Sequence, residues 1–189
     1  RGVVVKTTRK PLPYSLQRVK LSYAQWGQYR AEVDSTGPVA KFWGGSLDYR
    51  LLGAYVSGDA YYSNMALKNK AIHPSLQFTH GPTTLLVALD AQSRGRPIND
   101  QMILDPSQDG TIYTGAGRRE SWTFPNSYGE YKFSNVRMQM RHFLSDSWVL
   151  KSNIMVARTE QEYMPYTYPN ETNFRTMTRT FLVRNFNTV

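Results

Sequence analysis

Arginine and aromatic side chains collect in one long segment of this chain, Ser93–Glu130. Guanidinium groups pair with anionic oxygens, and aromatic faces pack against the organic part of a ligand. Recognition residues are common on long loops carried by a rigid scaffold, so we expect ligand contacts here, with an ordinary solvated loop as the alternative. The candidate binding residues are Arg94, Arg96, Tyr113, Arg118, Arg119, Trp122, Phe124 and Tyr128.

The sequence offers no comparable case for catalysis or for a resident metal. Asp105–Gly110 half-matches a calcium-binding loop, but Ala116 stands where the distal glutamate is needed, so a plain turn is the better interpretation. Cysteine is absent and the histidines lack the spacing of a zinc site. No nucleophile elbow or catalytic carboxylate pair stands out. We therefore expect no enzyme, no catalytic residue, no metal site and no cofactor.

Short segments of alternating polarity surround these residues and must position them. Apolar residues fall at every second position, as in half-buried strands. The clearest segments are Leu47–Val56, Ala71–His80, Thr84–Gln92, Lys132–Phe143, Leu150–Ala157 and Met177–Phe186.

The connections between these segments are of two unequal kinds. His80–Pro82 and Ser145–Ser147 are minimal turns, whereas Ser93–Glu130 far exceeds the usual loop length. A second connection, around Ser35–Gly45, precedes the segment that begins at Leu47. Short turns at one rim and long loops at the other are typical of an outer-membrane β-barrel, so we expect an all-β fold of antiparallel transmembrane strands.

Composition agrees with a membrane barrel better than with a soluble globule. The chain has 189 residues, with 13 Tyr, 8 Phe and 4 Trp, and a mean hydropathy of -0.52. Alternation of lumen-facing polar and lipid-facing apolar residues produces that average. The formal net charge is +9, but the basic residues are spread along strands, so we expect no nucleic-acid partner and instead a cationic lumen or a rim facing lipopolysaccharide.

Charged residues share one face of the predicted strands. In a wide barrel they would line the lumen and bond to water or to an enclosed domain. This predicted wall comprises Arg18, Lys20, Arg30, Glu32, Asp34, Asp48, Arg50, Asp90, Arg137 and Arg141. Pro74 lacks an N–H, so we expect a bulge or a local break there. Aromatic residues near strand ends suit interfacial girdles, namely Trp26, Phe143, Trp148 and Phe186.

Several stretches resemble TonB-dependent outer-membrane receptors of the siderophore-receptor type. Arg1–Pro11, reading RGVVVKTTRKP, resembles the close of the family's plug domain, with Arg1 where a glycine is frequent. Tyr23–Arg30 resembles the first barrel hairpin and Asp48–Tyr55 the third strand. Ile72–Phe78, reading IHPSLQF, resembles the fourth strand. The four stretches follow the family's order and spacing over about half of the chain.

This resemblance implies part of a plugged barrel of about 22 strands. Residues 1–10 would be the last plug strand, 11–15 a linker and 16–189 the N-terminal part of the barrel. The protein would lie in the bacterial outer membrane, against lipid and lipopolysaccharide, and import a ferric siderophore or similar metal chelate. Its energy would come from the TonB complex, through an N-terminal part that the sequence lacks. Two alternatives stay open, a small stand-alone barrel with a structural or adhesive role and a soluble β-sandwich binding module.

Overall fold

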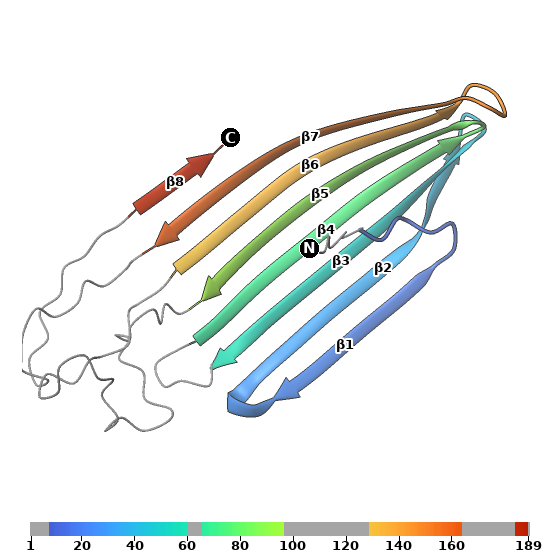
Figure 1. Ribbon diagram of the computed structural model, residues 1–189. Helices are drawn as coiled ribbons and strands as arrows, with labels where there is room; N and C mark the ends of the chain where they lie inside the picture. The colour runs from blue at the N-terminus through green and yellow to red at the C-terminus, as the bar shows by residue number, and fades with distance from the viewer. Residues whose placement is uncertain (1–7, 60–65, 97–128, 164–183, 189) are drawn as a thin grey trace, which may run out of the picture.

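A computed structural model of the chain describes residues 8–59, 66–96, 129–163 and 184–188. These residues form one antiparallel sheet in which each strand pairs with the next in the chain (Figure 1). The all-β fold class is therefore confirmed. The elements are β1 (Leu16–Ala24), the 3-10 turn η1 (Gln25–Gly27), β2 (Gln28–Phe42), β3 (Gly45–Asp59), β4 (Ala66–His80), β5 (Thr83–Arg96), β6 (Gly129–Phe143), β7 (Val149–Tyr163) and β8 (Arg184–Thr188). The described residues contain no helix long and apolar enough to cross a membrane.

The connection predicted around Ser35–Gly45 is wrong, because β2 runs to Phe42 and pairs there with Gly45. A register shift between Pro38 and Ala40 interrupts the alternation, which hides the strand from a pattern of period two. The connection is the two-residue turn Trp43–Gly44, with φ of 50° and 73°. Positive φ at both positions matches the twist of a hairpin.

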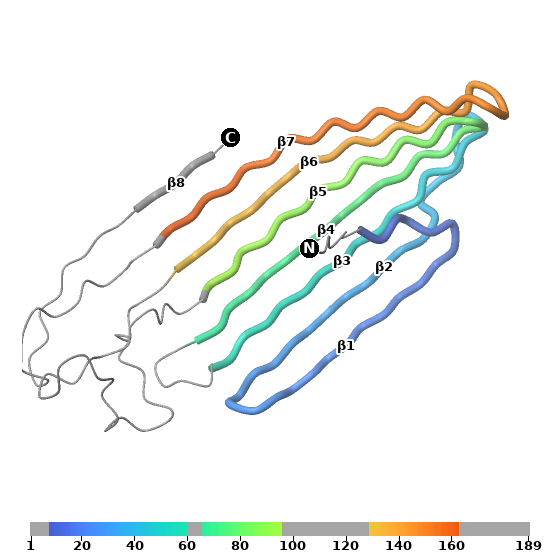
Figure 2. The backbone as a smooth tube through the Cα atoms, in the orientation of Figure 1, coloured from blue at the N-terminus to red at the C-terminus, as the bar shows by residue number. Residues whose placement is uncertain are grey.

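Short turns lie together at one end of the sheet, called here the turn end (Figure 2). They are Trp43–Gly44, Gly81–Pro82 and residues 144–148, where Leu144 N donates to Trp148 O over 2.9 Å. The minimal turns predicted at Gly81–Pro82 and Ser145–Ser147 are confirmed. At the opposite end of the sheet, called here the loop end, lies η1. The connections 60–65, 97–128 and 164–183 fall outside the described residues. Of the predicted strand Met177–Phe186, the residues from 184 onward are described, as part of β8.

Pro74 produces the local break that its missing N–H predicts, without a bulge. Between β3 and β4 it pairs with Leu51 in continuous register. Between β4 and β5 the pairs Ile72–Ala91 and Ser75–Ala88 keep one register, while no pair forms at the two positions between them. The strand therefore continues past the proline on both sides.

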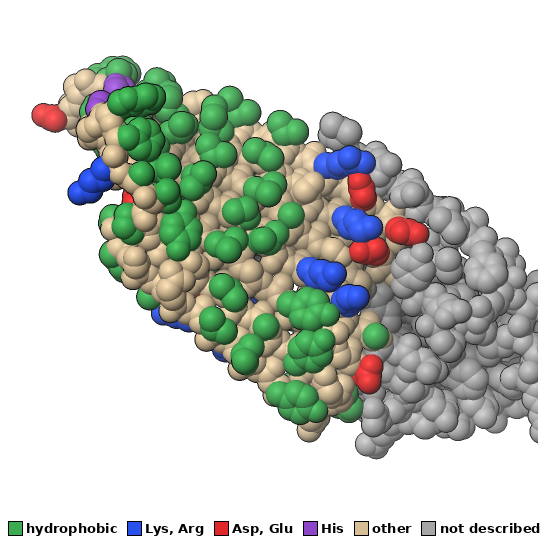
Figure 3. Space-filling model, turned by 180° about the vertical axis from the view of Figure 1, so that it is seen from behind, with side chains coloured by type: hydrophobic (Ala, Val, Ile, Leu, Met, Phe, Trp, Pro, Cys, Tyr) green, Lys and Arg blue, Asp and Glu red, His purple; other side chains and the backbone are tan. Residues whose placement is uncertain are grey.

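The two faces of the sheet differ in polarity. Few apolar side chains among the described residues are buried, namely Leu86, Ala88 and Pro11, while large apolar side chains cover the outer, convex face (Figure 3). In water such exposure would oppose folding, whereas hydrocarbon is the solvent that this face fits. The outer face includes Val19, Leu21, Val33, Ile72, Leu76, Val87, Leu89, Val136, Met138, Ile154 and Val156.

Aromatic side chains occur at both ends of this apolar face. At the loop end the rings of Tyr29 and Tyr55 lie 5.8 Å apart. At the turn end Phe42 stacks on Phe78 at 5.1 Å. Of the predicted girdle residues, Trp26 lies in η1 and Trp148 in the 144–148 turn. Phe143, the last residue of β6, instead shares the inner face with Arg141, whose guanidinium carbon lies 4.4 Å from the centre of its ring. Phe186 belongs to β8, and its side chain is outside the description.

The sheet has two edges within the described residues, because β1 pairs with β2 alone and β8 with β7 alone. An eight-stranded barrel closes by pairing its first and last strands. A sandwich needs a second sheet packed on the first. Within the described residues β1 and β8 do not pair with each other, and no second sheet packs on the first.

Candidate functional site

The register places all of the predicted charged wall on the inner face of the sheet. Arg18 pairs with Asp34 and Lys20 with Glu32 across β1 and β2, and the same alternation continues through the later strands. The wall runs as Arg18, Lys20, Arg30, Glu32, Asp34, Asp48, Arg50, Asp90, Arg137 and Arg141. The prediction of a polar inner face is therefore confirmed.

An N-terminal strap, residues 8–15, crosses this inner face (Figure 1). Arg137 Nη2 donates to Thr8 Oγ1 over 3.1 Å, and Arg50 Nη1 donates to the Lys10 carbonyl over 2.8 Å. Leu12 N donates to Thr36 Oγ1 over 3.0 Å. Prolines on both sides of Leu12 have no N–H and keep the chain extended, so one amide anchors this part of the strap.

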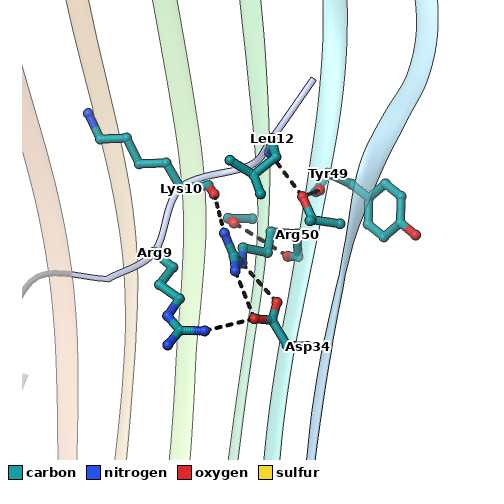
Figure 4. Close-up of polar contacts among 8 residues, drawn as sticks. Arg9, Lys10, Leu12, Asp34, Tyr49 and Arg50 are labelled. Atoms are coloured by element: carbon teal, nitrogen blue, oxygen red, sulfur yellow. Dashed lines mark hydrogen bonds and ion pairs between the residues drawn. The ribbon is translucent and has the colours of Figure 1, made fainter. Parts of the chain in front are cut away.

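A charged cluster under the strap holds it to the sheet (Figure 4). Arg50 Nε and Nη2 donate to the two carboxylate oxygens of Asp34 over 2.9 and 2.7 Å. Arg9 Nη1 donates to the same carboxylate over 2.9 Å. The Asp34 and Arg50 side chains are 9% and 6% exposed. Charges this buried persist only when paired and hydrogen-bonded, and the strap supplies part of that pairing.

Thr36 joins the strap to the backbone of β3. Its side chain is fully buried, accepts from Leu12 N and donates to the Tyr49 carbonyl over 2.7 Å. A hydroxyl is suited to this position because it donates and accepts at once.

We predict that Thr36→Val loosens the strap without unfolding the sheet. The substitution removes the acceptor for Leu12 N–H, and one neutral hydrogen bond contributes about 1 kcal/mol. Hydrogen exchange of the peptide 11–13 reports this directly, because Leu12 carries its sole backbone N–H. We expect about a fivefold to tenfold loss of protection. Ser35→Ala, which removes a hydroxyl on the opposite face beside Tyr49 Oη, is the control and should leave that amide unchanged.

An inner hollow of about 660 Å³ opens between the strap and the loop end. Its charged lining is mixed, and Asp34 is already paired with Arg50 and Arg9. His73 Nδ1 lies 3.2 Å from Asp90 Oδ1. Lys20 Nζ lies 4.0 Å from Glu32 Oε2, with its side chain 67% exposed. Arg18 and Arg94 also line the hollow, and guanidinium groups bind anionic oxygens through two parallel hydrogen bonds. The charged lining residues are Arg9, Arg18, Lys20, Glu32, Asp34, His73, Asp90 and Arg94.

Arg94 was predicted on a loop, but it lies in β5 and lines the inner hollow. The predicted strand ended too early because Ser93 and Gly95 are weak strand signals, yet both pair with β6. Arg96 is the last residue of β5, and its side chain is outside the description. The other candidates also fall outside the described residues, namely Tyr113, Arg118, Arg119, Trp122, Phe124 and Tyr128.

Sequence reasoning missed the contacts of the strap, which depend on Arg9, Lys10, Leu12 and Thr36. The Pro-Leu-Pro run predicted a linker, but nothing in its composition predicts where the linker docks. Within the described residues no cluster of His, Cys, Asp or Glu could hold a metal ion. The arrangement of charged side chains around the inner hollow is suited to binding a ligand.

No protein-family model matches this sequence, and no curated protein matches it significantly. Solved structures do share its fold, and they are TonB-dependent receptors. Over 95% of this chain, a chain of the FpvAI–pyocin S2 complex superposes with a TM-score of 0.78 at 18% identity. The ferric-catecholate import receptor Fiu from E. coli K12 superposes over 95% of this chain in closed and open forms, with a TM-score of 0.69 at 13% identity.

The described chain therefore has the fold of barrel wall found in TonB-dependent receptors, the family that the sequence also resembles. It spans 23% of the FpvAI complex chain and 27% and 30% of the two Fiu chains.

Proposed function

We propose that this chain is the N-terminal part of the barrel of an outer-membrane receptor that imports a ferric siderophore or a similar nutrient with energy from the TonB complex. The observation that carries this is the combination of an apolar outer face, a charged inner face and a strap bound to the inner face. The shared fold with an import receptor supports it. The bacterial outer membrane would be its location, and transport rather than catalysis its role.

Contacts on the inner face support the proposed division of the chain, in which residues 1–10 end a plug domain, 11–15 form a linker and 16–189 belong to the barrel. Thr8 and Lys10, described without regular secondary structure, already lie against the sheet. The inner-face side chains of Lys20 and Arg30 are 67% and 52% exposed. A polar body packed inside the barrel would therefore find charged groups there to hydrogen-bond.

The cations that line the inner hollow support the proposed ligand class. Ferric chelates present anionic oxygens, which Arg18, Lys20 and Arg94 at the loop end could meet. The aromatic candidates between 97 and 128 would add faces for the organic shell of the chelate. TonB would act through an N-terminal part beyond this chain.

Uptake of radioactive iron tests the proposal. The full-length protein is produced in a strain without ferric-siderophore receptors of its own, and ferric chelates are supplied one at a time. We expect accumulation from at least one chelate when TonB is present and a fall to background when TonB is deleted. Accumulation that persists without TonB, or none from any chelate despite correct insertion in the outer membrane, would contradict the proposal.

A further inference from the structure

A second hollow lies on the inner face of the sheet, between the strap and the turn end. This turn-end hollow has a volume of about 600 Å³, which is within the range of small-molecule pockets. Strands β4, β5, β6 and β7 form its wall, and Lys10 of the strap borders it on one side. The hollow is therefore large enough for a small ligand.

The charged lining of the turn-end hollow is entirely cationic among the described residues. Lys10, Arg141 and Lys151 contribute to it, and no carboxylate does. The inner hollow differs, because four lysine and arginine side chains there stand against three carboxylates. None of the three cations at the turn end forms an ion pair within the described part of the chain. Their positive charge is left without compensation.

The register of β6 and β7 brings two of these cations together. Arg141 and Lys151 are direct cross-strand partners on the inner face, and like charges in this position repel each other. The corresponding pair of Arg18 and Asp34, across β1 and β2, joins opposite charges. An anion shared by Arg141 and Lys151 would replace their repulsion by attraction to a common partner.

Contacts within the described chain hold two of the cations in position. The guanidinium carbon of Arg141 lies 4.4 Å from the centre of the Phe143 ring, which leaves the N–H groups at the guanidinium edge free to donate. The Lys10 carbonyl accepts from Arg50 Nη1 over 2.8 Å, and the Lys10 side chain is directed away from the Asp34 carboxylate (Figure 4). Groups ordered in advance lower the entropy cost of binding.

Neutral donors complete the lining of the turn-end hollow. Gln77, Gln139 and Asn153 contribute side-chain amides, and Thr84 contributes a hydroxyl. Amide N–H and hydroxyl O–H groups donate to the same oxygen acceptors that the cations bind. The lining therefore favours a ligand that carries many oxygen acceptors and several negative charges.

A smaller hollow of about 270 Å³ lies under the strap, between the two larger ones. It shares Arg9 with the inner hollow and shares Lys10 and Gln139 with the turn-end hollow. Arg137 adds a further cation to its lining. An anion that leaves the inner hollow toward the turn end would thus meet cations along the whole way.

We infer that the turn-end hollow is a second binding site for an oxygen-rich polyanion, reached from the inner hollow past the strap. Lys10, Arg141 and Lys151 bind the anionic oxygens, and the carboxamides donate to the remaining acceptors. The rise in positive charge from the inner hollow to the turn-end hollow draws the ligand toward the turn end. The inference deepens the proposed function and rests on it, because the ligand is the anionic metal chelate that the receptor would import.

Protection of a thiol in the turn-end hollow tests the inference on the full-length protein in detergent. Asn153→Cys places the thiol there, in a segment that has no cysteine of its own, and any cysteine elsewhere in the full-length protein is replaced by serine. The probe is tricarballylate, a tricarboxylate, and its neutral trimethyl ester is the control. At about ten times its dissociation constant, tricarballylate should slow modification by iodoacetamide about tenfold, while the ester should have no effect.

Removal of the cations by K10Q/R141Q/K151Q in the N153C protein tests their part in binding. The tricarballylate concentration needed for protection should rise about a hundredfold, because a hydrogen bond to a charged group contributes about tenfold and solvent screens part of it. The matched control K70Q/K132Q/R158Q also removes two lysines and one arginine, from the outer face at the loop end. Its protection should stay within about twofold of that in N153C alone.

Four results would overturn the inference. They are equal protection by the ester, no protection by tricarballylate, an equal rise in both triple variants, and a thiol in N153C that iodoacetamide cannot reach because protein fills the hollow. Iron uptake separates this failure from a failure of the proposed function. A protein that imports iron without protection of the thiol refutes the turn-end site alone, whereas protection without import contradicts the proposed function alone.

Discussion

Replacement of Asp34 by alanine is expected to destabilise the folded protein by about 3 to 5 kcal/mol, because it leaves the Arg50 guanidinium buried without its counter-ion. Arg50 would keep the Lys10 carbonyl as a partner but lose both of its carboxylate contacts. Arg9 would lose its contact as well, so the strap should detach in part. Urea unfolding of the full-length protein refolded into detergent or liposomes measures the effect.

Glu32→Ala is the matched control for Asp34→Ala. Glu32 is two residues away on the same strand and face, and it pairs with Arg30 in an exposed position. Exposed pairs contribute little, so the expected loss is below about 1 kcal/mol. Equal losses from Glu32→Ala and Asp34→Ala would show that burial of the Asp34–Arg50 pair is not what stabilises the strap.

A double substitution separates two quantities: the net contribution of the Asp34–Arg50 ion pair to the free energy of unfolding, and the cost of leaving one of its charges buried alone. Asp34→Leu together with Arg50→Met removes both buried charges and keeps most of the side-chain volume. Buried pairs replaced in this way are often neutral, so most of the stability lost in Asp34→Ala should return. The strap should stay loose in the double variant, since its Lys10 and Arg9 contacts are gone, and exchange of the Leu12 amide would show this.

Strand order and the division into two faces could be predicted from the sequence because they depend on local alternation. Arg137 and Val136 are neighbours in the chain, and their polarity alone assigns them to opposite faces. The end of β2 could not be predicted in this way, because the register shift at Val39 moves the pattern by one residue. Arg94 was predicted on a loop because Gly95 interrupts the alternating pattern before β5 ends at Arg96.

The contacts of the candidate site depend on pairs distant in sequence, which no local pattern contains. Arg9 and Asp34 are both visible as charged residues, but their contact requires the strap to turn back over β2. The contact between Thr8 and Arg137 joins residues from opposite parts of the chain. Composition indicated a polar inner wall, and three-dimensional structure was needed to show which of its charges are buried.

Val136→Arg tests the membrane-facing surface and should destabilise the inserted protein by about 2 to 4 kcal/mol, the cost of an arginine near the bilayer midplane. Val136 is exposed on the outer face, with Leu89 and Val156 as its cross-strand neighbours. Refolding into liposomes, followed by reversible unfolding in guanidinium chloride, gives the free energy of unfolding in the presence of the bilayer.

Asn135→Arg provides the control, because Asn135 precedes Val136 in β6 and faces the inner side opposite Asp90. An arginine at position 135 would stay on the polar inner face beside the Asp90 carboxylate, so it should cost less than about 1 kcal/mol. The two variants thus compare the loss of unfolding free energy when an arginine faces lipid with the loss when it faces the lumen. Similar losses at both positions would mean that the apolar face contacts something other than hydrocarbon, and the outer-membrane assignment would then fail.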